Sequence, residues 1–136
     1  MEVNFEIEDN YAVQFQRRHI DLHNNFELVE IRYLQNLIEI EFKKSAGDWV
    51  SQDEPNELLF LFKEVSFKYE KEGGDHLFLE DWKILGELSF FPSSLRSVND
   101  GIMPKKLPNK EDDILFYFEN GRMIRINCEE VELKVK

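Results

Sequence analysis

The sequence predicts a mostly antiparallel β domain, either a sandwich or a partly open barrel of about seven or eight strands. Three observations support this fold class. Apolar and polar residues alternate with a period of two in several stretches, as in strands that bury one face. The dipeptide Asn120-Gly121 lies between two β-prone runs, which is a strong hairpin signal. The 136 residues also fall within the usual ~100–200 of one domain, so we expect a single domain over 1–136.

The amino-terminal part contains two short predicted strands. Apolar residues alternate with polar ones over 3–7, and the polar sequence at 8–10 offers a turn before a second run at 11–15. The segment that follows, 17–25, is polar and has no clear period.

The next two runs predict a β-hairpin over 26–33 and 37–44, joined at Gln35-Asn36. Apolar residues occupy one parity of each run and charged residues the other. We therefore expect one face to join the core and the other to face solvent.

Two later stretches fit either a strand or a helix. In 57–69 apolar residues also recur at helical spacing, but five consecutive apolar residues and many aromatics favour a strand buried on both faces. The apolar parity changes around Lys63-Glu64, which indicates a β-bulge. In 77–90 we favour a strand from Ile84 to Phe91, with room for one short helix near Trp82.

A second aperiodic segment extends over 92–113. It holds three of the four prolines and the basic pair Lys105-Lys106 in an otherwise acidic chain. A loop of this length inside a compact domain is usually mobile or functional. We therefore expect a flexible loop with a functional surface.

The carboxyl-terminal region predicts a second hairpin, over 114–118 and 123–128, closed by a two-residue type I′ turn at Asn120-Gly121. This turn would place Tyr117 opposite Ile124 on an apolar face. A third strand over 131–135 would complete a meander.

The same register defines a second, mixed face of this hairpin. Phe118 would lie opposite Met123, and Phe116 opposite Arg125. Because this face combines aromatic and charged side chains, we expect it to be only partly covered and to be available for a partner or a second copy.

Composition restricts the function. The chain has 28 acidic and 17 basic residues and a net charge of −11, which argues against nucleic acid or anionic membranes and favours a basic protein partner. The amino terminus has no signal-peptide pattern, and no apolar run approaches ~18 residues. The single cysteine, Cys128, is expected to be a small buried hydrophobe in a reducing compartment. We therefore expect a cytoplasmic protein.

Candidate chemistry is sparse. His19, Asp21 and His23 would share a face on a strand, where they could bind a metal or transfer protons, so a metal-dependent hydrolase is a weaker alternative. A hydrogen-bonded turn before the 26–44 hairpin is the preferred interpretation, because no zinc-site spacing, phosphate loop or nucleophile elbow is present. We expect no catalytic residue, cofactor or metal.

The twelve phenylalanines have two interpretations. In a β domain they mostly form the core. They could also line a cavity, so a small-molecule or lipid-binding barrel is the main alternative function.

Seven segments follow one another in a recognisable order: 22–24 (Leu-His-Asn), 28–31, 37–42, 60–65, 116–121, 124–128 and 131–133. This order resembles a group of small bacterial β proteins of unknown function. Some members of this group are immunity proteins of polymorphic toxin systems, which bind and neutralise a cognate toxin. The resemblance implies a structural position for His23. An acidic residue often follows this histidine in the group, whereas this chain has Asn24.

Taken with the acidic charge, the resemblance implies a non-enzymatic protein-binding module, in its particular form an immunity protein that neutralises a basic toxin. We expect a monomer or a homodimer. The expected partner-binding residues come from the mixed hairpin face and the basic pair: Phe116, Phe118, Met123, Arg125, Lys105 and Lys106.

Overall fold

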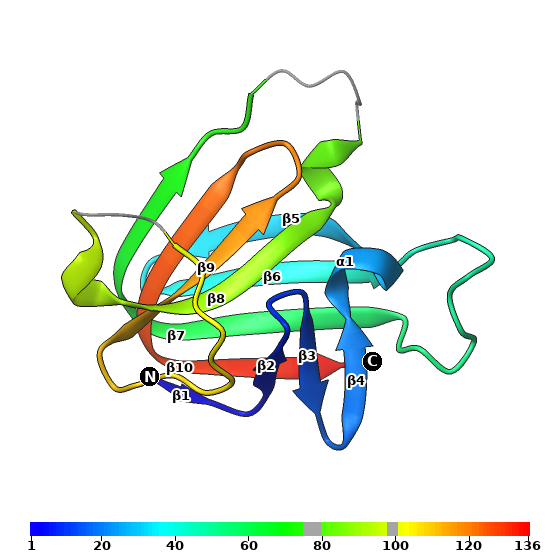
Figure 1. Ribbon diagram of the computed structural model, residues 1–136, viewed down its shortest axis with the longest axis horizontal. Coiled ribbons are helices and arrows are strands. Elements are labelled where there is room, and N and C mark those ends of the chain that lie inside the picture. The colour runs from blue at the N-terminus through cyan, green and yellow to red at the C-terminus, as the bar shows by residue number, and fades with distance from the viewer. Residues whose placement is uncertain (75–79, 98–100) are drawn as a thin grey trace.

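The computed structural model describes residues 1–74, 80–97 and 101–136 (Figure 1). The chain is mostly β, and its main sheet curls into a half-barrel, which confirms the predicted fold class. The antiparallel strands of this sheet follow in the order β5 (Phe26–Leu34), β6 (Leu37–Lys44), β7 (Glu57–Lys71), β10 (Met123–Val135), β9 (Asp112–Phe118) and β8 (Leu85–Pro92). The short strand β1 (Glu2–Val3) pairs with β10 in parallel.

A small second sheet packs against the half-barrel. It consists of β2 (Glu6–Glu8), β3 (Ala12–Phe15) and β4 (Arg18–Asp21), and its residues Ile7, Val13 and Ile20 belong to the same core as the main sheet. Phe5 meets Phe60 of β7 edge-to-face at a centroid distance of 5.5 Å. The two sheets therefore share one hydrophobic core, because neither could bury its apolar face alone.

The half-barrel is open between its edge strands, β5 and β8, and α1 (Leu22–Asn25) makes contacts with both. Backbone groups of β8 find partners outside the sheet. Leu88 N donates to Asn10 O at 2.8 Å, and His23 Nδ1 donates to Leu85 O at 2.7 Å. The amino-terminal segment thus covers an edge that would otherwise expose unpaired backbone groups.

The strand predictions for the middle of the chain are confirmed. β5 and β6 form the expected hairpin, with Leu34 opposite Leu37, and 57–71 is a strand rather than a helix. The predicted bulge is present: the register of β7 against β10 shifts opposite Asn127 and Cys128, and Glu64 has a left-handed φ of 55°. The expected short helix near Trp82 is the 3-10 turn η1 (Asp81–Lys83), and β8 follows it. The part of the 77–90 prediction at 77–79 lies outside the described residues.

The predicted register of the carboxyl-terminal hairpin is wrong by one residue. Tyr117 lies opposite Met123, and Phe116 lies opposite Ile124. Phe118 N donates to Arg122 O at 2.9 Å, so the loop has three residues, and Gly121 alone among them has a positive φ, 87°. A three-residue loop of this kind ends in a left-handed glycine instead of using Asn-Gly as a type I′ pair.

The predicted third strand of the meander is not separate. Residues 131–135 continue β10, which is 13 residues long and pairs with β7 from Met123 to Val135. β9 accompanies only its first part, from Met123 to Ile126. β10 can stay extended because β7, with 15 residues, is long enough to pair along its whole length.

The aperiodic segment 92–113 begins with the 3-10 turn η2 (Ser93–Leu95), and its residues 101–111 lie against the sheets. Met103 N donates to Ser89 Oγ of β8 at 2.8 Å. Ile7 N of β2 donates to Lys106 O at 2.9 Å. Residues 98–100 lie outside the described part. Among the described residues, no helix has the length and apolar character needed to cross a bilayer.

Candidate functional site

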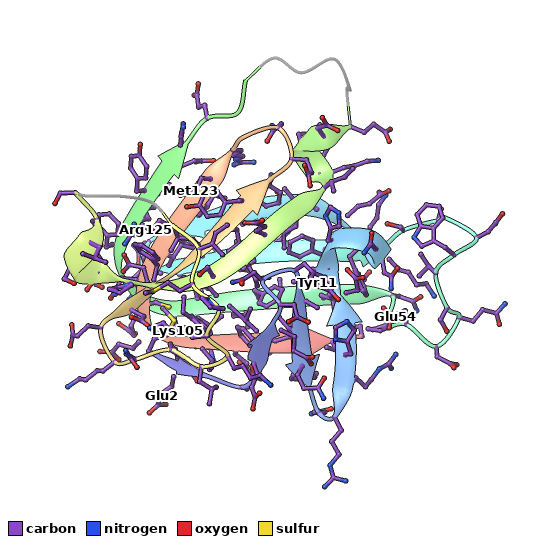
Figure 2. All side chains as sticks on the ribbon, viewed as in Figure 1. Glu2, Tyr11, Glu54, Lys105, Met123 and Arg125 are labelled. Carbon is purple, nitrogen blue, oxygen red and sulfur yellow. The ribbon has the colours of Figure 1, made fainter. Side chains whose placement is uncertain are left out.

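The corrected register divides the residues that we expected to form one partner-binding surface. Phe116 and Phe118 point into the core and are 0% and 4% exposed, whereas Met123 and Arg125 lie on the opposite face of the sheet and are buried as well. A shift of one residue moves an entire set of side chains to the other face of a strand. The expectation of one half-exposed mixed face is therefore wrong. Figure 2 labels Met123 and Arg125, both of which belong to β10.

Arg125 belongs to a buried polar network. Its Nε lies 2.6 Å from Asp113 Oδ2, and Arg96 Nη2 lies 2.6 Å from Asp113 Oδ1. Burial raises the pKa of Asp113, but the hydrogen bonds from Arg96, Arg125 and Asn127 outweigh burial and hold it below its usual range. These contacts give Arg125 a structural role in the sheet.

The basic pair is divided as well. Lys105 forms an ion pair with the buried carboxylate of Asp112, whereas Lys106 is exposed. The positive charge expected at this segment is thus partly neutralised within the chain.

The structure separates His23 from His19 and Asp21, because β4 ends at Asp21 and His23 lies on α1, which begins at Leu22. The expectation that all three would share one strand face is therefore wrong for His23. Asp21 caps the helix and accepts from Asn24 N at 2.9 Å, whereas His19 Nδ1 lies 3.4 Å from Glu8 Oε2. Within 1–74, 80–97 and 101–136 there is no group of His, Cys, Asp and Glu side chains that could hold a metal ion.

Many of the phenylalanine side chains fill the core. The ring of Phe60 contacts those of Phe42, Phe62 and Phe116 at centroid distances of 6.0, 6.5 and 5.7 Å, and all four are 0% exposed. These rings pack on one another, as expected if the phenylalanines mostly form the core.

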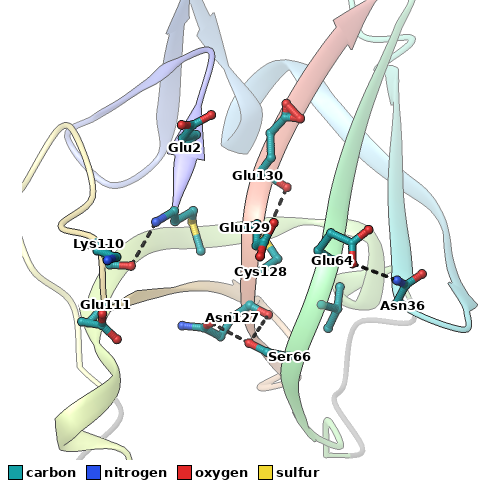
Figure 3. Close-up of a pocket in the computed structure, with 12 residues that line it drawn as sticks. Glu2, Asn36, Glu64, Ser66, Lys110, Glu111, Asn127, Cys128, Glu129 and Glu130 are labelled. Carbon is teal, nitrogen blue, oxygen red and sulfur yellow. Dashed lines mark hydrogen bonds between the residues drawn. The ribbon is translucent and has the colours of Figure 1, made fainter.

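An open hollow of about 1070 Å³ lies where β1, β7 and β10 meet residues 110–111 (Figure 3). We call it the acidic hollow, because five carboxylates line it: Glu2, Glu64, Glu111, Glu129 and Glu130. Lys110 is the one basic side chain in its lining.

Two local features bring these carboxylates together. The parallel pairing of β1 with β10 places Glu2 beside Glu130. The bulge of β7 places Glu64 in a left-handed conformation, and its Oε2 accepts from Asn36 Nδ2 at 3.1 Å. A positive φ costs a residue with a Cβ roughly 1–2 kcal/mol, and strained residues cluster at functional sites. Glu64 is therefore the residue of this hollow for which a functional role is most expected.

Most of the carboxylates of the acidic hollow are not neutralised. Lys63 Nζ lies 3.5 Å from Glu130 and 2.8 Å from Glu132. In the described part of the chain, no basic side chain lies within salt-bridge distance of the other four carboxylates: Glu2, Glu64, Glu111 and Glu129. Because charges of one sign in a concave surface reinforce one another, the hollow attracts cationic groups.

The floor of the acidic hollow is connected to the buried network. Ser66 Oγ donates to Asn127 Oδ1 at 2.8 Å, and Asn127 Nδ2 donates to Asp113 Oδ1 at 2.8 Å. Cys128 also lines the hollow but is only 5% exposed, and burial raises its pKa to about 12. Cys128 is thus a buried thiol, as predicted, and it stays protonated at neutral pH.

Sequence reasoning missed this site because its carboxylates come from four separate segments, each of which resembles an ordinary solvent-facing strand or loop. The available signal was the change of apolar parity at Lys63-Glu64, which marks the bulge. Comparisons of the chain with protein-family models, with curated proteins and with solved structures found no match.

Proposed function

We propose that this chain is a non-enzymatic protein-binding module that docks a basic protein at the acidic hollow. The observation that carries the proposal is a set of four carboxylates, the strained residue Glu64 among them, that have no basic side chain within salt-bridge distance in the described part of the chain. In its particular form the proposal is an immunity protein that neutralises a basic toxin, as the order of segments suggested.

The proposed binding mode follows from the charges. Complementary charge speeds association and selects the partner, whereas packed groups at the centre of the interface supply most of the affinity. Lys or Arg side chains of the partner would enter the hollow. They would supply the counterions that Glu64 and Glu129 do not find among the described residues of their own chain. The floor at Ser66 and Asn127 is held by hydrogen bonds, so little ordering is needed on binding.

The test is affinity capture from cells of the source organism, with captured proteins quantified by mass spectrometry and the neighbouring gene's product as the first candidate. The wild-type chain is compared with the double variant Glu64→Lys/Glu129→Lys. We expect a basic protein that the wild type captures and the double variant captures at least about tenfold less, because several unlike-charge contacts become repulsive.

The matched control is Glu87→Lys, which changes an exposed glutamate on β8, away from the residues of the hollow. The Glu87→Lys variant should capture the same basic protein as the wild type does. Equal capture by the wild type and the double variant, or equal loss in the control, would contradict docking at the acidic hollow.

A further inference from the structure

A second open hollow, of about 620 Å³, lies beside α1, between the first residues of β5 and the segment that leads into β8. We call it the indole hollow, because the exposed residue Trp49 lines it. Phe26 and Ile84 contribute apolar surface to the lining. None of its lining residues belongs to the acidic hollow, so the two sites are separate. Ligand sites are common at the mouths of β-barrels, and this hollow lies at the open side of the half-barrel.

Trp49 is held in place although it is 69% exposed. Its Nε1 donates to Asn24 O of α1 at 2.9 Å. The ring also lies against Gly47, where a Cβ would overlap it, so this close approach requires glycine. Among the described residues, no cationic group lies over the indole. An exposed indole that is fixed from two directions is a platform for a flat or cationic ligand group.

The lining of the indole hollow is negative. It contains four carboxylates and one lysine: Glu27, Glu80, Asp81, Glu119 and Lys83. Lys83 Nζ lies 3.3 Å from Glu27 Oε2 and 3.2 Å from Glu80 Oε2, so these two carboxylates have a counterion. In the described part of the chain, no Lys or Arg lies within salt-bridge distance of Asp81 or Glu119. Two carboxylates are therefore left to attract a cation from outside.

The histidine beside Glu119 gives its proton to another group. His23 Nδ1 lies 3.7 Å from Glu119 Oε1 but donates to Leu85 O at 2.7 Å. The backbone N–H of Glu119 donates to Ile84 O at 2.8 Å, which brings the β9–β10 turn to the segment that carries Asp81. The fold thus places both carboxylates in the hollow that Trp49 lines.

We propose that the indole hollow binds an arginine side chain of a protein partner. A guanidinium is planar and weakly hydrated, so it stacks on an indole while its five N–H donors serve carboxylates. A quaternary ammonium also stacks, but it has no donor to offer to Asp81 and Glu119. A neutral sugar would leave the charge of both carboxylates uncompensated. The chemistry of the lining therefore selects a guanidinium.

The test is an NMR titration of the isotope-labelled chain with acetyl-arginine amide, which reads the indole N–H signals of its two tryptophans. The variant Trp49→Phe assigns these signals. We expect a saturable shift of the Trp49 signal and about tenfold weaker binding of acetyl-citrulline amide, which keeps the shape of arginine without its charge. Acetyl-lysine amide should also bind more weakly, because an ammonium has no plane to stack.

Variants of the two carboxylates test their part in binding. Asp81→Asn and Glu119→Gln should each raise the dissociation constant of acetyl-arginine amide about threefold, as expected for partly exposed charge pairs. The matched control is Glu129→Gln, which removes a carboxylate of the acidic hollow and should leave this constant unchanged. Circular dichroism checks that each variant is folded. The control also keeps the result independent of docking at the acidic hollow.

Three results would overturn the proposal. The first is a Trp49 signal that does not shift, or shifts equally with the citrulline or lysine probe. The second is a dissociation constant that depends on Glu129 but not on Asp81 and Glu119, since the probe would then occupy the acidic hollow. The third is tighter binding of free arginine than of the amide, which would assign the site to the amino acid instead of a protein side chain.

Discussion

Arg125 Nε lies 2.6 Å from Asp113 Oδ2, and the two side chains are only 1% and 0% exposed. Asp113 also accepts from Arg96, whereas Arg125 Nη2 donates to Pro92 O at 3.0 Å. The pair thus connects β9 and β10 with the end of β8. A buried ion pair contributes little net stability, but it is costly to break because removing one partner leaves an uncompensated charge.

Replacement of Asp113 by Asn should lower the free energy of unfolding by about 3–5 kcal/mol, because it removes the buried carboxylate to which both Arg96 and Arg125 donate hydrogen bonds. Urea denaturation at neutral pH measures the change. Glu111→Gln, which removes an exposed carboxylate two residues away, is the control and should stay within about 0.5 kcal/mol. A similar loss in both variants would contradict a special role for the buried pair.

The loss of stability in Asp113→Asn should depend on pH. The pKa of Asp113 is lower in the folded chain than the ~3.9 of an unfolded aspartate, so its ionisation stabilises the fold above about pH 4. This contribution is lost as the pH falls below 4 and through the folded pKa. The difference in unfolding free energy between wild type and Asp113→Asn should therefore narrow below pH 4. A constant difference from pH 7 to pH 3 would show that Asp113 does not titrate as expected.

The turn between β3 and β4 is expected to be strained. Gln16 and Arg17 both have positive φ, 49° and 67°, in a two-residue loop closed by Phe15 opposite Arg18. Neither residue type favours this conformation, whereas glycine adopts it freely. We expect Arg17→Gly to raise the free energy of unfolding by about 1 kcal/mol, as measured by urea denaturation.

Arg17→Ala is the matched control for this turn. It removes the same side chain but keeps a Cβ at the left-handed position, so it should give no comparable gain. If alanine and glycine stabilise the chain equally, the effect comes from the charge of Arg17 and not from its backbone conformation.

His23 is expected to contribute to stability through the edge of β8. Its Nδ1 donates to Leu85 O at 2.7 Å, and His23→Ala would leave this partly buried carbonyl without its partner. The loss should be about 1–2 kcal/mol in the free energy of unfolding, as measured by thermal or urea denaturation. His19→Ala is the control, because His19 is exposed and its ring lies beside Glu8 and Tyr11 at the surface. An equal, small effect of both variants would contradict this role of His23.

Local patterns predicted the elements whose conformation is marked by their own residues and by the turns beside them. The β5–β6 hairpin and the strand 57–71 follow from alternation, aromatic content and nearby turn residues. The Gln16-Arg17 turn could not be predicted, because its residues disfavour the conformation and the pairing of Val13 with Ile20 imposes it. The register of the last hairpin was missed because an Asn-Gly sequence fits both a two-residue and a three-residue loop.

Of the acidic hollow, the sequence predicted only the sign of the charge. The acidic composition and the bulge at Lys63-Glu64 were visible in the sequence, whereas the aromatic hairpin face expected to bind the partner is buried. The residues of this hairpin were expected on one exposed face because the predicted register was wrong by one residue. Such an error assigns side chains from the inner and the outer face of a strand to the same face.

The sequence by itself determined that this chain is built of strands and carries an excess of negative charge, since both properties depend on residues near one another or on a simple count. Only the tertiary structure decided which glutamates meet. Glu2 reaches Glu130 through the parallel pairing of β1 with β10, and Glu64 joins them through a bulge whose position depends on β10. Such contacts join residues far apart in the chain, and no local pattern specifies them.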